Sequence, residues 1–505
     1  MDLTKYFVKS YSGWYRISGD DDDVKKQIKS DINQYDIDTD SIDDNGNTIL
    51  HILCDACVVD AIILLLAKYS DMNVNVKNKE GNTPLHVAAN SCRGSKVVKI
   101  LIDNFNVNVN SVNKRHETPL YLSCKSGHSQ TVEVLINNSN VDINMTDNYG
   151  RTPLYIACDN ENIGCVNALI QHRYIDLNKA NDDGNTPLMA VIGYYNHDYV
   201  ELLLGLSSNI RHVDQFGSDD TLKPKYYPNI DDNPININQT DNDGNTALHI
   251  ACRDDCNYET IWILLDHPKL DINKVNKNGY TPLMLAFTEL HFDLAQPLLT
   301  CDNINVNTVN SNNDTLIHIC CHMATSSSTT TNNIITTIKN SYVSQEAIKS
   351  IIFHPNLDIN AVNYDGDTAL HIAVNTNNIF IIKLLLSHPK IDINKPDSLK
   401  TVYKNLYDDN NTNNSDSDSG SNYSDDDEDN KLTTFNSHVG STVKDKYDTT
   451  PLMLACSKGY NDIIELLLSH PGINIHITDS DGCSAITYAQ KFCSPSIKTK
   501  LSSMC

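Results

Sequence analysis

The sequence has no long hydrophobic run and comparatively little positive charge, and both absences restrict what the protein can do. Its most apolar stretch, residues 61–67, is far too short to cross a bilayer, and the N-terminus lacks the apolar core of a secretory signal. Lys and Arg number 39 against 64 Asp and Glu, and the net charge of −25 opposes binding to phosphate backbones and anionic lipids. We expect a soluble, cytoplasmic, monomeric protein that binds neither nucleic acid nor membrane.

The motifs that usually carry catalysis are absent as well. The chain has no Walker-type Gly-Lys-Ser loop, no Gly-x-Ser-x-Gly elbow, no His-Glu-x-x-His pair and no protein-kinase motif set. An enzyme needs a nucleophile with its base, a metal cage or a phosphate cradle. The sequence therefore predicts a protein that is not an enzyme, with no catalytic, cofactor-binding or metal-binding residues and no cofactor.

What the sequence does contain is a repeated segment. Residues 81–88, Gly-Asn-Thr-Pro-Leu-His-Val-Ala, recur in altered forms, mostly every 34 or 35 residues. Such a period predicts a stack of units in which each covers the apolar face of its neighbour. The threonines of the successive copies are Thr48, Thr83, Thr118, Thr152, Thr186, Thr246, Thr281, Thr315, Thr368 and Thr450, with Ser484 in the same place in the last copy.

Each copy reads as a turn followed by two helices. An Asp-Asn-Asp-Gly turn places Gly244 where a positive φ is expected, and the glycine is replaced elsewhere by His116, Asn313 and Asp448, which are types found at positive φ. The threonine suits a helix N-cap, and a proline often follows it at the first helical position. An amphipathic second helix comes next. In several copies it ends in His-Pro, where histidine meets partial negative charge and is expected to cap the helix.

Two polar residues recur at fixed repeat positions. An asparagine eight residues before the threonine predicts a ladder of side-chain to backbone hydrogen bonds joining adjacent repeats. A histidine three residues after the threonine favours hydrogen bonding within the turns over a single active site. The asparagines are Asn75, Asn110, Asn144, Asn178, Asn238, Asn273, Asn307, Asn360 and Asn394, and the histidines are His51, His86, His249, His318 and His371.

Fifteen cysteines raise the alternative of a zinc site. Six of them lie six residues after a repeated threonine, which predicts small buried packing residues: Cys54, Cys124, Cys158, Cys252, Cys321 and Cys456. Local groups also occur at residues 51–57 and 318–322, but zinc needs four convergent ligands, usually as two separated pairs. We favour reduced structural cysteines, with a zinc-dependent enzyme as the third-ranked hypothesis, which a metal assay would test.

Thr83-Pro84-Leu85-His86-Val87-Ala88 resembles the ankyrin-repeat family, in which Thr-Pro-Leu-His-x-Ala recurs at this period. The resemblance covers residues 36–490 apart from insertions. It implies an all-α fold, an ankyrin-repeat solenoid of about 10–11 helix-turn-helix repeats with three loop insertions. It also implies a concave groove that binds other proteins. The abundance of Asn, Asp, Ile and Tyr resembles ankyrin-repeat proteins of giant DNA viruses or protists, and a viral protein would work in the host cytoplasm.

Three long gaps between threonines predict insertions between intact repeats. The expected organisation is a degenerate cap in residues 1–35, repeats one to five in 36–206, a loop in 207–232, repeats six to eight in 233–321, a Ser/Thr-rich loop in 322–341, repeat nine with flanking helices in 342–396, an acidic disordered insertion in 397–444, and repeats ten and eleven with a C-terminal cap in 445–505. Serines among the acidic residues of the last insertion are either kinase substrates or part of a solvated spacer, which we favour.

The resemblance places partner contacts at exposed turn and helix positions. The candidate partner-binding residues are Tyr149, Asp182, Asp183, Tyr194, Asn242, Asp243, Tyr280, Tyr364 and Tyr447, because tyrosine is enriched at interfaces and the carboxylates would attract a basic patch. The leading hypothesis is a noncatalytic scaffold whose concave face binds a partner protein. The alternative is a substrate adaptor for a ubiquitin-ligase complex, recruited through an F-box-like or other docking element in residues 1–35 or through the tail at 491–505.

Overall fold

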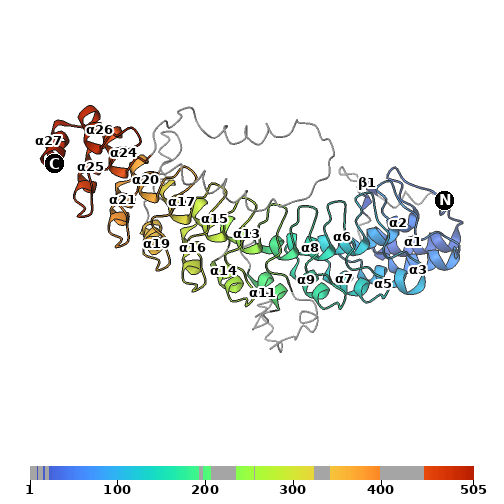
Figure 1. The fold of residues 1–505 in the computed structure, drawn as a ribbon. Coiled ribbons are helices and arrows are strands. Elements are labelled where there is room, and N and C mark those ends of the chain that lie inside the picture. Colours follow the sequence, from blue (N-terminus) through green and yellow to red (C-terminus); the bar gives the residue numbers. More distant parts are fainter. Residues whose placement is uncertain are drawn as a thin grey trace, which may run out of the picture. The chain divides into compact units, whose positions relative to one another are not determined.

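The structure, a computed structural model, describes residues 8–9, 15–16, 22–192, 197–205, 235–254, 256, 258–322, 342–397 and 448–504. The chain divides into two units, Met1–Asp271 and Ile272–Cys505. Each unit is a stack of helix pairs, with the first helices in one row and the second helices in another (Figure 1). The described residues form eleven such pairs, and the predicted all-α repeat architecture is confirmed.

The first unit contains six pairs. Its first helices are α2 (Ile49–Asp55), α4 (Pro84–Ala89), α6 (Pro119–Lys125), α8 (Pro153–Asp159), α10 (Pro187–Ile192) and α13 (Ala247–Arg253). Its second helices are α3 (Val59–Lys68), α5 (Ser95–Asn104), α7 (Ser129–Ile136), α9 (Ile163–Ile170), α11 (Asp198–Leu204) and α14 (Tyr258–Leu265).

The second unit contains five pairs. Its first helices are α15 (Pro282–Thr288), α17 (Leu316–His322), α20 (Ala369–Asn375), α24 (Pro451–Lys458) and α26 (Ala485–Phe492). Its second helices are α16 (Phe292–Leu299), α19 (Tyr342–Ile352), α21 (Ile379–Leu386), α25 (Asn461–Leu468) and α27 (Pro495–Ser503).

The local chemistry of the repeats matches the sequence prediction. Thr83 precedes α4, and its hydroxyl accepts a hydrogen bond from the backbone N–H of His86. The turn before each first helix has its left-handed residue, which is glycine in most copies and His116, Asn313 or Asp448 where glycine is missing. These three residues have φ between 58° and 66°, so the predicted backbone demand is confirmed.

A second left-handed position lies between the two helices of a pair and was not predicted. It falls nine residues after the threonine, where Gly127 and Gly459 have positive φ. Four other copies carry a residue with a Cβ there, namely Cys57, Glu161, Leu290 and Asn377, with φ between 53° and 70°. The sequence pattern hid this position because glycine occupies it in only a minority of the copies.

The predicted asparagine ladder is present in both units. The side chain of Asn110 donates from Nδ2 to the carbonyl of Asn140 (2.7 Å) and accepts at Oδ1 from the N–H of Asp142 (2.9 Å). Each such asparagine thus satisfies two backbone groups of the following repeat. The same pair of bonds is made by Asn75, Asn144, Asn238, Asn273, Asn307, Asn360 and Asn394.

The histidines of the His-Pro sequences act differently from the prediction. The N–H of Lys390 donates to Nδ1 of His388 at 3.2 Å, and His267, His354 and His470 accept in the same way from the residue two positions on. Burial lowers the pKa of His267, His354 and His388, which favours the neutral ring. The expected cap through charge at the helix end is wrong, because an accepting ring nitrogen braces the turn that follows the helix.

The core of each unit lies between the two helix rows. Leu85, Leu101 and Leu120 are at most 1% exposed, and the six in-phase cysteines are buried, as predicted. At the N-terminal end of the first unit, α1 (Asp22–Gln34) packs on α3, and its Ile28 and Ile32 are buried. The only other regular structure described is the antiparallel pair β1 (Val8–Lys9) and β2 (Tyr15–Arg16).

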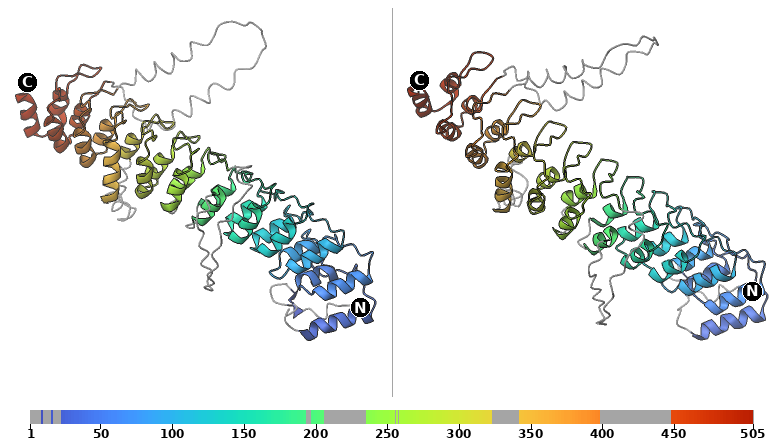
Figure 2. Two further views of the ribbon diagram at one scale, coloured as in Figure 1. Left: turned by 90° about the horizontal axis from the view of Figure 1, so that it is seen from below. Right: turned by 60° about the horizontal axis from the view of Figure 1, so that its bottom comes forward.

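The described helices on either side of the three predicted insertions, seen from two further directions in Figure 2, differ from one insertion to the next. The first insertion, predicted at 207–232, falls between α11 and α13, the second helix of one repeat and the first helix of the next. Residues 323–341 instead separate α17 from α19, and these two helices contact each other, so α19 is the second helix of repeat eight and no flanking helix.

The third insertion also differs from the prediction, because it interrupts a turn. The Asp448 N–H donates to the carbonyl of Asp397 at 3.0 Å, and the Asp397 N–H donates to the carbonyl of Thr449. The predicted loop at 207–232 and disordered segment from 398 to 444 lie outside the described residues, as does the Ser/Thr-rich loop apart from His322, which ends α17. Among the helices described, none is long and apolar enough to span a membrane.

Candidate functional site

The turns that precede the first helices each expose two tip side chains, because one Asn or Asp side chain closes the turn through hydrogen bonds to its backbone. In repeat three, Asn113 lies five residues before Thr118, and its Oδ1 accepts from the N–H groups of Arg115 (2.9 Å) and Glu117 (3.0 Å). This Asx turn closes the hairpin and leaves the intervening residues at its tip. Equivalent bonds form at Asp43, Asn78, Asp147, Asn181 and Asp241 in the first unit.

Successive tips in the first unit are joined through their backbones. The N–H of Asn148 donates to the carbonyl of Arg115 (3.1 Å), and the N–H of Asp182 donates to that of Tyr149 (3.0 Å). Backbone groups thus hydrogen-bond one tip to the next, and the side chains of the tip residues are left on the surface. We call the two tip residues of repeats two to six the tip ridge: Lys79, Glu80, Lys114, Arg115, Asn148, Tyr149, Asp182, Asp183, Asn242 and Asp243.

Five of the predicted partner-binding residues come together on this ridge. They are Tyr149, Asp182, Asp183, Asn242 and Asp243, all exposed, on three consecutive tips. The N–H of Asn242 donates to the Asp183 carbonyl at 2.9 Å, and the Asn242 side chain donates to the Asp182 carbonyl at 2.8 Å. Tyr149 is 65% exposed, with the Arg151 guanidinium 5.0 Å from its ring centre.

The other four predicted residues are not part of the ridge. Tyr280 and Tyr364 belong to the second unit, and Tyr280 is half-buried one residue before its threonine. Tyr364 is 36% exposed at a hairpin tip, where its N–H donates to the Asn312 carbonyl. Tyr194 and Tyr447 lie outside the described residues.

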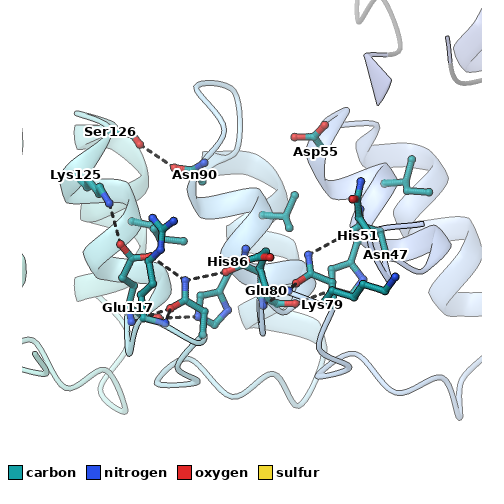
Figure 3. Close-up of a pocket in the computed structure, with 18 of the residues that line it drawn as sticks. Asn47, His51, Asp55, Lys79, Glu80, His86, Asn90, Glu117, Lys125 and Ser126 are labelled. Carbon is teal, nitrogen blue, oxygen red and sulfur yellow. Dashed lines mark hydrogen bonds and ion pairs between the residues drawn. The ribbon is translucent and has the colours of Figure 1, made fainter. Parts of the chain in front are cut away.

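A hollow of about 910 Å³ lies beside the tips of repeats one to three, and its lining residues were not among the predicted site residues. Its lining combines tip residues with the exposed sides of the first helices (Figure 3). Ile52, Val87 and Leu122, each four residues after its threonine, provide apolar surface, and Asn90 and Ser126 hydrogen-bond across it at 2.8 Å. The equal repeat positions of these lining residues are the signal that could have located the hollow.

Two ion pairs neutralise the carboxylates buried beneath the tips. Lys125 Nζ lies 2.9 Å from Oε1 of Glu117, which is 4% exposed. Arg151 donates twice to Oδ2 of Asp147, at 2.9 and 2.7 Å. Burial by itself would raise the pKa of Asp147, but the hydrogen bonds from Arg151 and Tyr121 outweigh it and lower that pKa. The lowered pKa keeps Asp147 ionised, and both carboxylates stabilise their turns through these contacts.

The in-phase histidines join adjacent repeats. Nδ1 of His86 accepts from the N–H of Thr83 (3.1 Å), so Nε2 carries the proton and donates to the carbonyl of Glu117 (3.1 Å) in the next repeat. Burial lowers the pKa of His86 to about 4 and also lowers that of His51 and His318. The predicted role in the turn network is confirmed, and the bonds leave no lone pair of His86 for substrate chemistry.

In the two cysteine-histidine groups considered for zinc, the histidines are hydrogen-bonded in the turns and the cysteines named below are buried in the core. Nδ1 of His318 accepts a hydrogen bond from the N–H of Thr315. Cys320 and Cys321 are buried, and burial raises the pKa of both thiols. His51 bonds to Thr48 in the same manner, and Cys54 is fully buried. Within the described ranges, no three His, Cys, Asp or Glu side chains are grouped so that they could hold a metal ion.

The repeat geometry has a counterpart in known protein families. A model of multiple ankyrin repeats matches three segments, of which the first two overlap: residues 16–113, 92–181 and 226–310. Residues 441–489 match a second ankyrin-repeat model, and residues 365–398 match the model of a single ankyrin repeat. The chain belongs to the ankyrin-repeat family. Proteins of this family generally bind other proteins, and the fold is typically noncatalytic.

Individual proteins resemble this ankyrin-repeat chain only in part. A protein described as a probable serine/threonine-protein kinase of Dictyostelium discoideum is 32% identical over 120 residues, which is 23% of this chain and 12% of that protein. The crystal structure of the ankyrin repeat domain of Bcl-3, described as a unique member of the IkappaB protein family, is similar with a TM-score of 0.40 and 21% identity. That similarity covers 48% of this chain and 95% of the Bcl-3 domain.

Proposed function

We propose that this ankyrin-repeat chain is a noncatalytic scaffold that binds a partner protein through the tip ridge and the adjoining helix surface of its first unit. The observation that carries the proposal is the continuous exposure of Tyr149, Asp182, Asp183, Asn242 and Asp243 on three adjacent tips whose backbones are already hydrogen-bonded to one another. Such a ridge can present side chains with little ordering cost, because the backbone is fixed before the partner arrives.

Tyrosine and carboxylates contribute differently to such an interface. The ring of Tyr149 offers a large contact area with few rotatable bonds, so its burial would supply affinity. Asp182, Asp183 and Asp243 would mainly raise the association rate and the selectivity for a basic patch. The hydrogen-bonded histidines and paired carboxylates beneath the ridge serve the fold, which agrees with a role in binding and not in catalysis.

A site-specific photo-crosslinker tests the proposal. Tyr149 is replaced by a photoreactive phenylalanine analogue in the full chain, and crosslinks are collected in the source cell. The matched control carries the same analogue at Tyr174, which is 62% exposed after α9 and away from the tips. We expect a discrete protein adduct from position 149 that is lost when Asp182 and Asp183 are changed to Lys. Adducts of equal yield from both positions, or none from position 149, would contradict the proposal.

Several finer points remain predictions. A monomeric state, a cytoplasmic location and an origin in a giant DNA virus or a protist are tested by no feature of the described residues. The adaptor hypothesis rests on residues 1–35, of which 1–7, 10–14 and 17–21 are not described, and on the tail. Deleting residues 1–21 and assaying association with a ubiquitin ligase would separate the adaptor from a scaffold without such a role.

A further inference from the structure

The charge of the tip ridge changes sign along its length. The tips of repeats two and three carry Lys79, Lys114 and Arg115, with Glu80 as their one carboxylate. The tips of repeats five and six carry Asp182, Asp183 and Asp243 and no cation. Repeat four, between the two groups, presents Asn148 and Tyr149. The ridge is therefore basic at one end, aromatic in the middle and acidic at the other end, although the whole chain is strongly acidic.

The basic end remains cationic once its local contacts are counted. Lys114 and Arg115 are exposed, and neither side chain has an ion-pair partner among the residues that the structure describes. The buried carboxylate nearest to them, Glu117, is already paired with Lys125. Lys79 donates to a backbone carbonyl, that of Asp44, so its charge is not neutralised by a side chain. The other carboxylates that line the hollow are Glu80, at the tip of repeat two, and Asp43 and Asp55, which belong to repeat one.

We infer that the partner segment that binds this ridge is dipolar: an extended polypeptide with an acidic block over repeats two and three, a basic block over repeats five and six, and an apolar or aromatic residue against Tyr149. This inference rests on the proposed function and specifies the chemistry of the partner. It replaces the uniformly acidic face that the net charge suggested with a face of two signs.

The separation of the two charge groups explains why both blocks are needed. Packed helices lie about 8–10 Å apart, so the tips of repeats three and five are about 16–20 Å apart. This exceeds the Debye length of about 8 Å at physiological salt, and each group therefore attracts or repels on its own. A purely basic segment is attracted by the acidic end of the ridge and repelled by the basic end. A segment of opposite blocks is attracted at both ends, with about 5–6 extended residues between the facing ends of the two blocks.

The hollow adds space for side chains at the basic end. It lies beside the tips of repeats one to three, and its lining includes Lys79 and Asn90 (Figure 3), together with Arg115 and the amide group of Asn82. Amide groups and guanidinium donors suit the carboxylates of an acidic block, and Ile52 and Val87 suit the apolar stems of Glu side chains.

Synthetic peptides test the inference on the full-length chain. The first carries a block of roughly four Glu, a Gly-Ser spacer of about six residues with one central Phe, and a block of roughly four Lys. The comparison peptides keep the spacer and carry two Lys blocks or two Glu blocks. Binding is measured by fluorescence anisotropy at low and at physiological salt. The dipolar peptide should bind at least about tenfold more tightly than either comparison peptide.

Charge-swap variants supply the sharper test. K114E/R115E and D182K/D183K should each weaken binding of the dipolar peptide about tenfold. The quadruple variant K114E/R115E/D182K/D183K should recover most of the affinity, because the peptide can lie on the reversed ridge in the opposite chain direction. Lys277→Glu and Asp365→Lys, at equivalent tip positions in the second unit, are matched controls that should change binding less than twofold. Circular dichroism checks that the exposed substitutions leave the helices intact.

The outcomes separate this inference from the proposed function. If the two-Lys-block peptide binds as tightly as the dipolar one, if the quadruple variant binds no better than the doubles, or if no peptide binds, the dipolar assignment is wrong. The photo-crosslinking result at position 149 is independent of these peptides, so it can still support a protein partner of another charge pattern.

Discussion

Single residues in unfavourable conformations show how much strain the repeat tolerates. Leu290 has φ of 70° in the turn between α15 and α16, where two other copies have glycine. A left-handed residue with a Cβ costs roughly 1–2 kcal/mol relative to a right-handed one. The turn persists because its backbone is held by bonds from Leu290 N–H to Phe287 and from His291 N–H to Ala286.

This strain predicts a stabilising substitution. L290G should raise the free energy of unfolding of the second unit by about 1 kcal/mol relative to L290A. The alanine variant is the control, since both changes remove the same half-buried side chain beyond Cβ and only glycine removes Cβ. Chemical denaturation monitored in both variants gives the difference. Equal stabilities would show that the left-handed conformation carries no cost.

His86 makes the stack sensitive to acid. Its pKa is about 4 in the folded protein against 6.5 in the unfolded chain, so the unfolded state binds the proton more readily. The stabilisation is complete above pH 6.5, falls as pH decreases and is lost below about pH 4, a span of about 3 kcal/mol to order of magnitude. Unfolding at a series of pH values measures it. H86Q should be less stable at pH 7 and show a shallower dependence between pH 6.5 and 4.

At the residue scale the sequence was a good guide where a residue type is forced by geometry. The replacement of glycine by His116, Asn313 and Asp448 was interpretable because few side chains accept positive φ. The accepting role of His388 was not predictable, since a ring nitrogen can donate or accept and only the position of the Lys390 N–H decides between them.

At the scale of the elements, the asparagine ladder replaces the backbone hydrogen bonds that a sheet would supply. Asn110 joins the segment before α6 to the segment after α7 through bonds to Asn140 and Asp142. The ladder therefore connects each pair of helices to the next through the segments that follow the second helices.

Removing one asparagine should therefore loosen a boundary between repeats. N110A removes the hydrogen bonds to the Asn140 carbonyl and the Asp142 N–H, which are exposed to water, and should cost about 0.5–1.5 kcal/mol. Amide hydrogen exchange should increase in residues 138–146 more than in α4. The control is N104A, since Asn104 donates to Ile100 in its own helix and is exposed. Equal effects of the two variants would contradict a role for the ladder in joining repeats.

Element order was largely predictable from the period, but the places of the insertions were not. The spacing between Thr315 and Thr368 shows that residues have been added to the repeat, but it does not show at which point of the repeat they are added. Only the contact between α17 and α19 assigns the gap to the inside of repeat eight. The candidate site was predictable in part: the ankyrin resemblance indicated the repeat positions of the five tip residues, whereas the hollow depends on how the helix surfaces lie in three dimensions.

At the scale of the whole molecule, stability depends on neighbours and so on the ends. The helix α1 covers α3 with Ile28 and Ile32, which are 2% and 0% exposed. In a stack of this kind, loss of a terminal cap weakens the adjoining repeat first and spreads inward. The average charge of the chain was a poor guide at this scale, because −25 is a sum and the basic tips at Lys114 and Arg115 are a local exception.

The cap can be tested by burying a charge in it. I32D should cost about 3 kcal/mol or more in the local stability of repeat one, because an unpaired carboxylate would lie against α3. Hydrogen exchange should rise in α2 and α3 and stay unchanged in the second unit. A substitution at exposed Lys26, K26D, serves as the control. Uniform acceleration across both units would show that the chain unfolds as one cooperative body instead.

The turn at Asp397 and Asp448 has a practical consequence. Because these two residues and Thr449 close the hairpin with their own backbone bonds, the repeat is complete without any particular sequence between them. Lengthening a loop between fixed ends costs little, roughly 0.6 kcal/mol for each doubling. A fluorescent protein inserted between Asp397 and Asp448 should therefore leave the repeats folded. Such a fusion would allow the protein to be followed in cells without a tag at either terminus.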